Sequence, residues 1–417
     1  MKHHTRLVVL LSLFLTASGI LVSPRGYANP QVPASQAAPH TPQGRMLTRL
    51  FTSSVVLANW FTPTFLSQVA APQVQTIISN MKQQLGPYQG VREDGTGFVV
   101  VFEKGIVPTR LVLNQQGLIS GLLFQAPRAH PKPSQDLTSA FKALPGKVSV
   151  LVLENGTPKL SHNPDQPLAV GSAFKLAVLN VLKTQIAAKQ QSWDAVVKLQ
   201  PQLKSLPSGF LHTWPAKSSL TVYSLAALMI SQSDNTATDH LIQLVGKPAL
   251  EKLSPRNTPF LMTREAFILK NPKNVSLRDR FLATETKQRQ ALLSESAPLP
   301  SVTDFESGVL SPEIEWFHTT TELCQIMANV ADLPVTQINP GLARPQDWQT
   351  ISFKGGSEPG VLNFTTQLQS KDGKTYCVSA TWNNNQPLEE AKFTALYSGL
   401  IDSLKSKPKA KPAATPN

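Results

Sequence analysis

The tetrapeptide Ser172-Ala173-Phe174-Lys175 places a hydroxyl and an amine three residues apart. Gly171 precedes it and an apolar run follows, which predicts the start of a buried helix. Residues three apart share a helix face, so we expect Lys175 within reach of the Ser172 hydroxyl. A lysine in a dry site can take the proton from a serine, and a helix N-terminus favours the oxygen that becomes charged. Ser172 is therefore predicted to be a nucleophile and Lys175 its base.

The Ser-x-x-Lys pattern alone is weak, because it also occurs at Ser79, Ser139 and Ser406. The same four letters recur from Ser139 to Lys142, but Ala143-Leu144-Pro145-Gly146 follows, which is typical of a helix end. Ser406 lies in the C-terminal tail. Context therefore favours Ser172.

Two further motifs carry groups that suit acyl transfer. Ser233-Asp234-Asn235 forms a polar turn between two apolar helical stretches, where its hydroxyl can pass a proton and its amide can bind substrate. Lys354-Gly355-Gly356-Ser357 ends a predicted strand, where the glycines let a substrate lie close to the edge and the lysine attracts a carboxylate. Taken singly, the first motif is as typical of a helix cap and the second of a hairpin turn.

The three motifs together, in this order and in these contexts, resemble the class A β-lactamases and related penicillin-binding proteins. The resemblance covers about residues 144–404 and implies an antiparallel sheet flanked by helices, an all-helical part, and a site between them. It makes Ser172 the acylated nucleophile, Lys175 its base and Ser233 the proton shuttle. The substrate contacts that it implies are Asn235, Lys354, Gly356 and Ser357, with the backbone N–H groups of Ser172 and Ser357 as the oxyanion hole.

Two positions depart from this family. Its third motif usually has Thr or Ser where this chain has Gly355. Its deacylating glutamate is best matched by Glu265, 32 residues after Ser233, but Leu269 stands where the assisting asparagine would be four residues later. Glu265 also fits the first turn of a helix that begins at Thr263, where acidic residues are favoured. The segments that carry these two positions, Thr263-Arg264-Glu265 and Lys354 to Gly360, are more similar to the poorly characterised serine hydrolase branch of the superfamily.

The N-terminus has the pattern of a secretion signal. Lys2 and Arg6 precede an apolar run, and Gly26-Tyr27-Ala28 suits cleavage after Ala28, with an uncleaved anchor as the alternative. Loss of residues 1–28 lowers the formal net charge from +13 to +10. We expect an exported protein, periplasmic or extracellular, with no later membrane span. Its charge allows contact with an anionic cell wall, although solubility alone explains it as well. Basic stripes interleaved with aromatics are absent, which argues against nucleic acid.

Composition divides the remaining chain into linkers and two folded parts. Residues 29–45 and 126–134 are predicted linkers, and 405–417 a basic disordered tail. Residues 46–125 predict a small α+β domain, with helices first and then strands at 98–102, 109–114 and 118–124. Its order loosely resembles cystatin-like or nuclear-transport-factor-like modules. Residues 135–404 predict an α+β hydrolase domain whose sheet combines a strand at 147–153 with strands at 350–354, 361–369 and 375–382, before a last helix at 388–404.

Several features near the predicted site stay open. Residues 271–312 form a polar stretch that we expect to lie beside the site and to shape substrate access. Trp316-Phe317 suits a cleft wall or the core equally well. Cys324 and Cys377 can pair in an oxidising compartment, but two small buried apolar residues are the favoured interpretation. Neither cysteine nor histidine spacing predicts a metal site, and no cofactor is expected.

The sequence thus favours a serine acyl-hydrolase for a small-molecule or peptidoglycan-like substrate. Within that class, a β-lactamase and a D-Ala-type peptidase or esterase with little β-lactam turnover remain unresolved. A third interpretation is a catalytically weak envelope-binding protein, which Gly355 and Leu269 favour. A fourth gives the principal role to the domain at 46–125, as a binder of wall polymer or of a partner.

Overall fold

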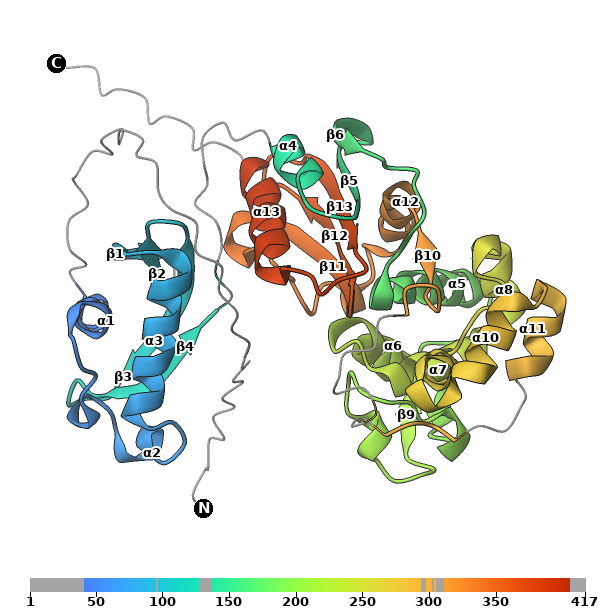
Figure 1. Cartoon of the computed structure of the whole chain (residues 1–417), viewed down its shortest axis with the longest axis horizontal. Helices are drawn as coiled ribbons and strands as arrows, with labels where there is room; N and C mark the ends of the chain where they lie inside the picture. Colours follow the sequence, from blue (N-terminus) through green and yellow to red (C-terminus); the bar gives the residue numbers. More distant parts are fainter. Residues whose placement is uncertain are drawn as a thin grey trace. The chain divides into compact units, whose positions relative to one another are not determined.

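The computed structural model describes residues 41–94, 97–125, 127, 137–293, 298–301, 304 and 311–405. The chain forms two compact units, Met1–His130 and Pro131–Asn417 (Figure 1). The predicted signal sequence, most of both predicted linkers and nearly all of the predicted tail lie outside the described residues.

In the described residues of the first unit, three α-helices are followed by a four-stranded antiparallel sheet in the order β1-β2-β3-β4. Its helices are α1 (Pro42–Thr52), α2 (Pro63–Leu66) and α3 (Ala71–Leu85). Its strands are β1 (Tyr88–Asp94), β2 (Gly97–Phe102), β3 (Ile106–Leu113) and β4 (Ile119–Phe124). The helices place Leu47, Phe51 and Ile78 against Val100 and Phe102 in one core. The predicted α+β order is confirmed, and β1 is an addition to it.

Helix α1 begins inside the segment that the sequence assigns to a linker through Arg45. Thr41 provides the reason, because its side chain accepts a hydrogen bond from Gly44 N at 3.3 Å and Pro42 occupies the first helical position. The proline at the end of this segment therefore begins a helix, which a linker assignment based on composition does not reveal.

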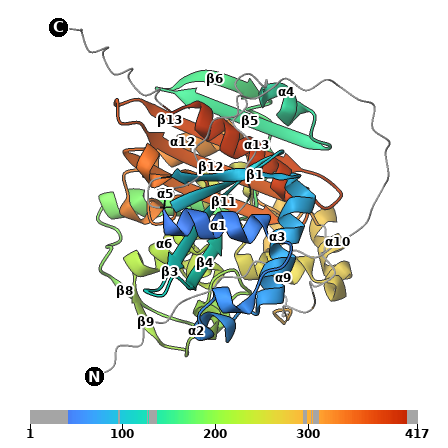
Figure 2. The same ribbon diagram turned by 90° about the vertical axis from the view of Figure 1, so that its left-hand side faces the viewer.

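The second unit is built on a five-stranded antiparallel sheet in the order β11-β12-β13-β5-β6, which can be followed in Figure 2. The strands are β5 (Lys147–Glu154), β6 (Thr157–His162), β11 (Thr350–Glu358), β12 (Val361–Gln369) and β13 (Thr375–Asn383). Both ends of the domain contribute to this sheet, as the sequence predicts. The fold class is therefore α+β with an antiparallel sheet, as expected.

Helices cover both faces of this sheet (Figure 1). On one face, α13 (Glu390–Ser403) and α4 (Leu137–Lys142) pack through Phe393 and Phe141, whose ring centroids lie 5.6 Å apart. On the other, α12 (Thr320–Val330) contacts β12, β13 and β5. The sheet residues that face α13 are apolar, as in Val150 and Val378, so burial of this face drives the packing.

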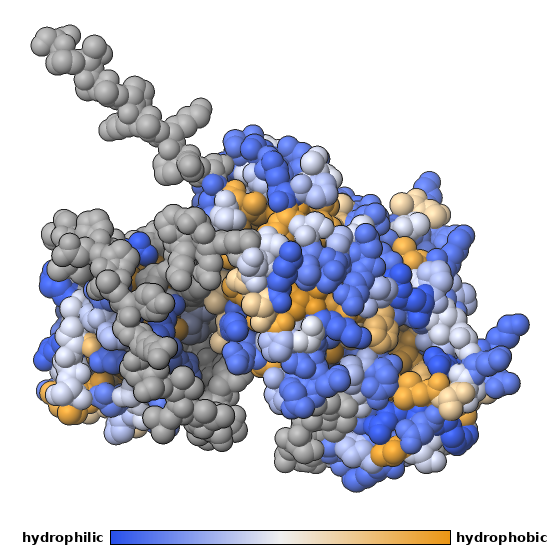
Figure 3. Space-filling view, turned by 45° about the horizontal axis from the view of Figure 1, so that its top comes forward, coloured by the Kyte–Doolittle hydropathy of each residue, from blue (hydrophilic) through white to orange (hydrophobic). Residues whose placement is uncertain are grey.

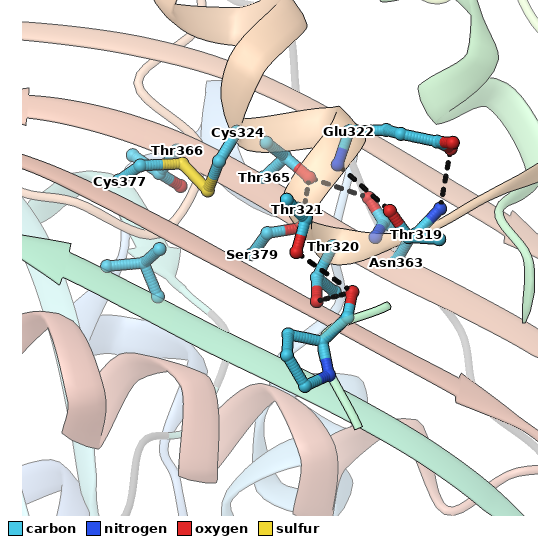
Figure 4. Close-up of a disulfide and its surroundings, with 12 residues drawn as sticks. Thr319, Thr320, Thr321, Glu322, Cys324, Asn363, Thr365, Thr366, Cys377 and Ser379 are labelled. Carbon is cyan, nitrogen blue, oxygen red and sulfur yellow. Dashed lines mark hydrogen bonds between the residues drawn. A yellow bond between two sulfur atoms is a disulfide. The ribbon is translucent and has the colours of Figure 1, made fainter. Parts of the chain in front are cut away.

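The face toward α12 is rich in hydroxyl groups, and a disulfide crosses it (Figure 4). Ser149 and Thr320 lie 2.8 Å apart through their side-chain oxygens, and Thr365 bonds Ser379 at 2.9 Å. Cys324 of α12 is bonded to Cys377 of β13. The favoured sequence interpretation, two unpaired buried cysteines, is therefore wrong, because the fold brings residues 53 positions apart onto facing elements.

The helical part of this unit runs from α5 to α11. Its helices are α5 (Lys175–Ala187), α6 (Val222–Ser231), α7 (Asn235–Val245), α8 (Lys247–Leu253), α9 (Thr263–Lys270), α10 (Val275–Ala283) and α11 (Thr286–Leu293). Helix α5 is the centre, with buried residues around nearly its whole first two turns. An all-round apolar helix is a core helix, so the residues at its start are fixed in position.

Short ribbons complete the unit. Strand β7 (Leu168–Ala169) pairs with β10 (Phe317–His318), and β8 (Val196–Lys198) pairs with β9 (Ser219–Thr221). Helices α10 and α11 lie in the stretch predicted only as a polar insertion. The face seen in Figure 3 is largely hydrophilic with separate hydrophobic areas. None of the helices in the described ranges has the length and apolar character needed to cross a membrane.

Candidate active site

Ser172 lies in a one-turn 3-10 helix, Gly171–Phe174, that leads directly into α5. Gly171 adopts φ +49°, a conformation that glycine tolerates best, and lets the chain turn sharply before the serine. Phe174 stacks on Trp316 with ring centroids 3.7 Å apart. The turn is thus fixed by packing on one side while Ser172 keeps partial exposure.

Lys175 is the centre of the site. Its Nζ lies 3.1 Å from Ser172 Oγ, 3.0 Å from Ser233 Oγ and 2.6 Å from both Ser233 O and Asn235 Oδ1. The side chain is completely buried. The geometry therefore brings together four of the residues that the motifs single out, from segments far apart in the sequence.

The site lowers the pKa of two lysines. Burial lowers the pKa of Lys175 well below its ordinary value, and the nearby charge of Lys354 lowers it further. Burial also lowers the pKa of Lys354 to about 7. Within the described ranges, no carboxylate lies close enough to either lysine to form an ion pair. Loss of solvation therefore dominates, and a lowered pKa favours the neutral form of an amine, which can accept a proton.

The Ser233-Asp234-Asn235 motif serves both as a helix cap and as part of the site. Asp234 is the N-cap of α7, and its carboxylate accepts hydrogen bonds from Ala237 N at 2.8 Å and Phe210 N at 2.7 Å. Ser233 adopts φ +54°, which is unusual for a residue with a Cβ. The cap fixes the turn, and the turn directs the Ser233 hydroxyl at Lys175. The two interpretations left open by the sequence are thus compatible.

Asn235 uses both ends of its amide within the protein. Its Oδ1 faces Lys175, and its Nδ2 donates to Leu206 O at 3.1 Å. The side chain is held in one orientation by these bonds. A substrate contact remains the prediction for this residue, and its clearest visible contact is with Lys175.

Lys354 and Gly356 reach the site from β11. The Nζ of Lys354 lies 3.2 Å from Ser233 Oγ and 2.5 Å from Gly355 O. A Cβ on Gly356 would overlap the carbonyl oxygen of Val170 and lie 2.6 Å from Ser172 N. Glycine is therefore required where β11 crosses the nucleophile turn. The next residue, Ser357, is exposed and its hydroxyl bonds Glu390 at 3.1 Å.

A narrow pocket opens on Ser172. It is lined by Ser172, Phe174, Asn235, Thr263, Ala266, Phe267, Lys270, Trp316 and Glu358. The first turns of α9 thus form one wall and the end of β11 another. Trp316 combines both roles considered for it, since it is buried in the core and also lines the pocket.

Glu265, the predicted deacylating residue, does not line this pocket. Its carboxylate lies 2.7 Å from Lys247 Nζ and accepts a hydrogen bond from Met262 N at 2.7 Å. It therefore caps α9 and pairs with α8, as the helix-start interpretation would have it. These contacts satisfy both of its oxygens, and we leave it out of the proposed machinery.

Sequence reasoning missed several charged residues around the pocket. Lys270, Glu315 and Glu358 form an ionic cluster, in which the lysine contacts both acids. Asp239 is fully buried and accepts bonds from Thr263 N at 2.7 Å and Arg264 N at 3.0 Å, which anchors the start of α9; burial raises its pKa to about 7. Of these residues, only Glu358 could have been singled out from the sequence, because it directly follows the lysine-glycine motif.

In the described parts of the chain, no three His, Cys, Asp or Glu side chains gather in a way that could hold a metal ion. The site instead consists of hydroxyls, amines and an amide.

Comparison with known proteins agrees with this arrangement. Residues 132–263 match the model of the Beta-lactamase enzyme family, a range that includes Ser172, Lys175, Ser233 and Asn235. The match confirms the resemblance to the β-lactamase and penicillin-binding-protein superfamily, and supports a serine hydrolase that acts on amide bonds. The search of curated proteins gave no match.

Solved structures with some likeness are a β-lactamase from Sphaerobacter thermophilus, PBP-A, and a β-lactamase from Chitinophaga pinensis. The first has 20% identity and a TM-score of 0.45, covering 64% of this chain and 94% of its own. PBP-A has 15% identity and a TM-score of 0.45, covering 67% and 98%. The third has 16% identity and a TM-score of 0.45, covering 64% and 98%. At these values the likenesses do not bear on activity.

Proposed function

We propose that the second unit is a class A-like serine hydrolase that cleaves a β-lactam or a related amide through an acyl-enzyme on Ser172. The observation that carries the proposal is the position of Lys175 Nζ, within hydrogen-bonding distance of both Ser172 Oγ and Ser233 Oγ. A buried amine with a lowered pKa between two hydroxyls is suited to proton transfer.

In the proposed reaction, Lys175 accepts the Ser172 proton as Oγ attacks the carbonyl carbon. The proton then passes through the Ser233 hydroxyl to the nitrogen that leaves. Lys354, 3.2 Å from Ser233 Oγ, supports this transfer and attracts a carboxylate on the leaving part. Such proton transfer contributes on the order of 10²–10⁴ in rate.

The backbone N–H groups of Ser172 and Ser357 are proposed to bind the oxyanion. In support, the backbone of β11 at Gly356 approaches Ser172 N closely enough to exclude a Cβ. Removal of one such donor costs on the order of 10²–10³ in rate.

The test is intact mass of the protein over time with penicillin G, beside Ser172→Ala and Lys175→Arg. An adduct in the wild type that is absent in Ser172→Ala supports the proposal. Lys175→Arg should lose acylation, because a guanidinium keeps its proton. Absence of any adduct in the wild type would refute β-lactam acylation and favour the binding-protein interpretation.

A slow-turnover peptidase or esterase is the second candidate, and one observation favours it. Helix α9 presents Thr263, Ala266, Phe267 and Lys270 to the pocket, and the carboxylate of Glu265 is engaged elsewhere. No acid of α9 is thus placed to activate water toward the acyl carbon. An adduct that persists would support this candidate, and a transient adduct with released product would support a β-lactamase.

Export is also proposed, with cleavage after Ala28. The disulfide between Cys324 and Cys377 supports it, because such bonds persist in oxidising compartments. An N-terminal sequence of the mature protein that begins at Asn29 would support it further. The first unit is proposed to bind a wall polymer or partner, which a pull-down with residues 41–125, where helix α1 and its cap stay whole, would test.

A further inference from the structure

Three ionisable side chains form a cluster beside the pocket, two of which, Lys270 and Glu358, line it. Lys270 is the last residue of α9, Glu315 precedes Trp316, and Glu358 ends β11. Lys270 forms a close ion pair with Glu315 and a longer one with Glu358, 3.7 Å from Nζ to Oε2. One ammonium therefore faces two carboxylates.

The two carboxylates are not equivalent. The Glu315 side chain is 1% exposed and takes the close contact with Lys270, whereas Glu358 is 27% exposed. Burial raises the pKa of Glu315 to about 7, although Lys270 opposes this shift. Its second oxygen, Oε2, has no hydrogen-bond partner within the described ranges. Lys270 thus makes its close contact with Glu315, whereas Glu358, which lines the pocket together with Lys270, is the more exposed and less closely paired of the two acids.

The position of Glu358 on β11 fixes where a cation would lie. Alternate residues of a strand share a face, so residues 354, 356 and 358 lie on one face, with about 13 Å from the first to the last. Lys354 is at one end, Gly356 lies against the nucleophile turn, and Glu358 is at the other end. A substrate along this edge with its carboxylate at Lys354 and its carbonyl at Ser172 would extend its acyl part toward Glu358.

We propose that Glu358 binds a protonated amine on the acyl part of the substrate, so that the preferred substrates carry an ammonium near the scissile carbonyl and a carboxylate on the leaving part. The proposal rests on the proposed acyl-enzyme function. The ion would pair with Glu358 and leave the close contact of Lys270 with Glu315 in place. Neutral and anionic acyl groups would lack this contact, and the anionic ones would meet repulsion.

The test uses three penicillins that differ in one substituent: penicillin G, its α-amino derivative ampicillin and its α-carboxy derivative carbenicillin. Second-order acylation rates are measured by intact mass at pH 6, where an α-amino group is protonated. The wild type should acylate fastest with ampicillin and slowest with carbenicillin, by about 5-fold or more at each step, as expected for a partly exposed ion pair of about 1 kcal/mol.

Variants then assign the preference to Glu358. Glu358→Gln should bring the ampicillin to penicillin G ratio close to one, and Glu358→Asp should retain the preference. Glu154→Gln, a charge change at the exposed pair of Glu154 with Lys374, is the matched control and should keep the wild-type ratio. In the wild type at about pH 9.5, where an α-amino group is neutral, the preference should disappear.

The outcomes separate the two proposals. Equal rates for the three penicillins in the wild type would overturn the role of Glu358 and leave the acyl-enzyme function standing. An ampicillin preference that survives both Glu358→Gln and pH 9.5 would overturn it too. No adduct with any penicillin would overturn the proposed function and this inference with it. The wild-type series needs no variant, so the inference remains testable if Glu358→Gln does not fold.

Discussion

The Oγ of Ser233 lies 3.0 Å from the Nζ of Lys175, in a turn where Ser233 adopts φ +54°. The side chain that the proposed proton route needs is therefore held at a backbone conformation that most residues avoid. A residue with a Cβ pays about 1 kcal/mol for this conformation relative to glycine. At position 233, the hydroxyl that the proposed proton transfer needs therefore comes with a backbone conformation that glycine would adopt at lower free energy.

We predict that Ser233→Gly and Ser233→Ala lose acylation equally, because both lack the hydroxyl between Lys175 and Lys354, by on the order of 10²-fold. Ser233→Gly should nevertheless be more stable than Ser233→Ala by about 1 kcal/mol. Acylation rates and chemical denaturation of the pair test this. A glycine variant that is no more stable than the alanine variant would contradict the account of the turn.

The crossing of β11 over the nucleophile turn predicts a strong effect of Gly356→Ala. The added methyl group would meet backbone atoms of Val170 and Ser172, which cannot move aside as a side chain can. We expect acylation to fall by on the order of 10²-fold or more, as when an oxyanion donor is displaced. Gly355→Ala is the control, because its methyl group would meet mainly the rings of Phe353 and Phe364 at 3.0–3.2 Å. Equal acylation by the two variants would contradict the prediction.

Glu265 should affect stability and leave deacylation unchanged. Glu265→Gln removes the ion pair with Lys247 but keeps an oxygen that can accept from Met262 N. We expect a loss of about 0.5–1 kcal/mol in the free energy of unfolding. The lifetime of the acyl-enzyme, followed by intact mass, should stay the same. A lifetime longer by tenfold or more would return Glu265 to the catalytic machinery.

The sequence predicted those parts of the site that are encoded locally. Ser172 and Lys175 are one turn apart, and the strands at 361–369 and 375–382 have apolar patterns that the structure reproduces almost residue for residue. The strands follow from short-range periodicity, which a single sequence records well. The division into a sheet flanked by helices and an all-helical part was implied by the family resemblance that the order of the motifs carries.

Long-range pairing could not be read in the same way. Strand β6 (Thr157–His162) carries mostly polar, exposed residues at the sheet edge, so it lacks the apolar alternation that marks a strand. The cysteine pair required knowledge of which face of α12 meets β13. The Lys270 cluster joins three segments that share no motif, and charge in the sequence does not reveal which partners meet.

The disulfide should contribute to stability without contributing to the reaction. In the chain-entropy description, a bond that closes a loop of this length stabilises by about 4 kcal/mol. The double variant Cys324→Ala, Cys377→Ala should therefore lower the free energy of unfolding by several kcal/mol. Its acylation rate should equal that of the wild type at temperatures where the variant is folded. Denaturation of the wild type with and without reductant provides the second measurement. An equal free energy of unfolding for the oxidised and the reduced protein would show that the disulfide does not stabilise the fold.

The lowered pKa of Lys354 predicts how stability depends on pH. Its pKa is about 7 in the folded protein, and a lysine in an unfolded chain ionises near 10.4. Between these values the unfolded state binds more protons, so the free energy of unfolding rises with pH and levels off above the unfolded pKa. Burial of Lys175 acts in the same direction. We expect a rise on the order of a few kcal/mol from pH 7 to pH 10.

In Lys354→Met this rise in the free energy of unfolding should be smaller, whereas Lys198→Met, at an exposed lysine of β8, should keep the wild-type slope. Denaturation curves at both pH values measure the difference, and parallel slopes for wild type and Lys354→Met would mean that Lys354 keeps its proton when the protein folds.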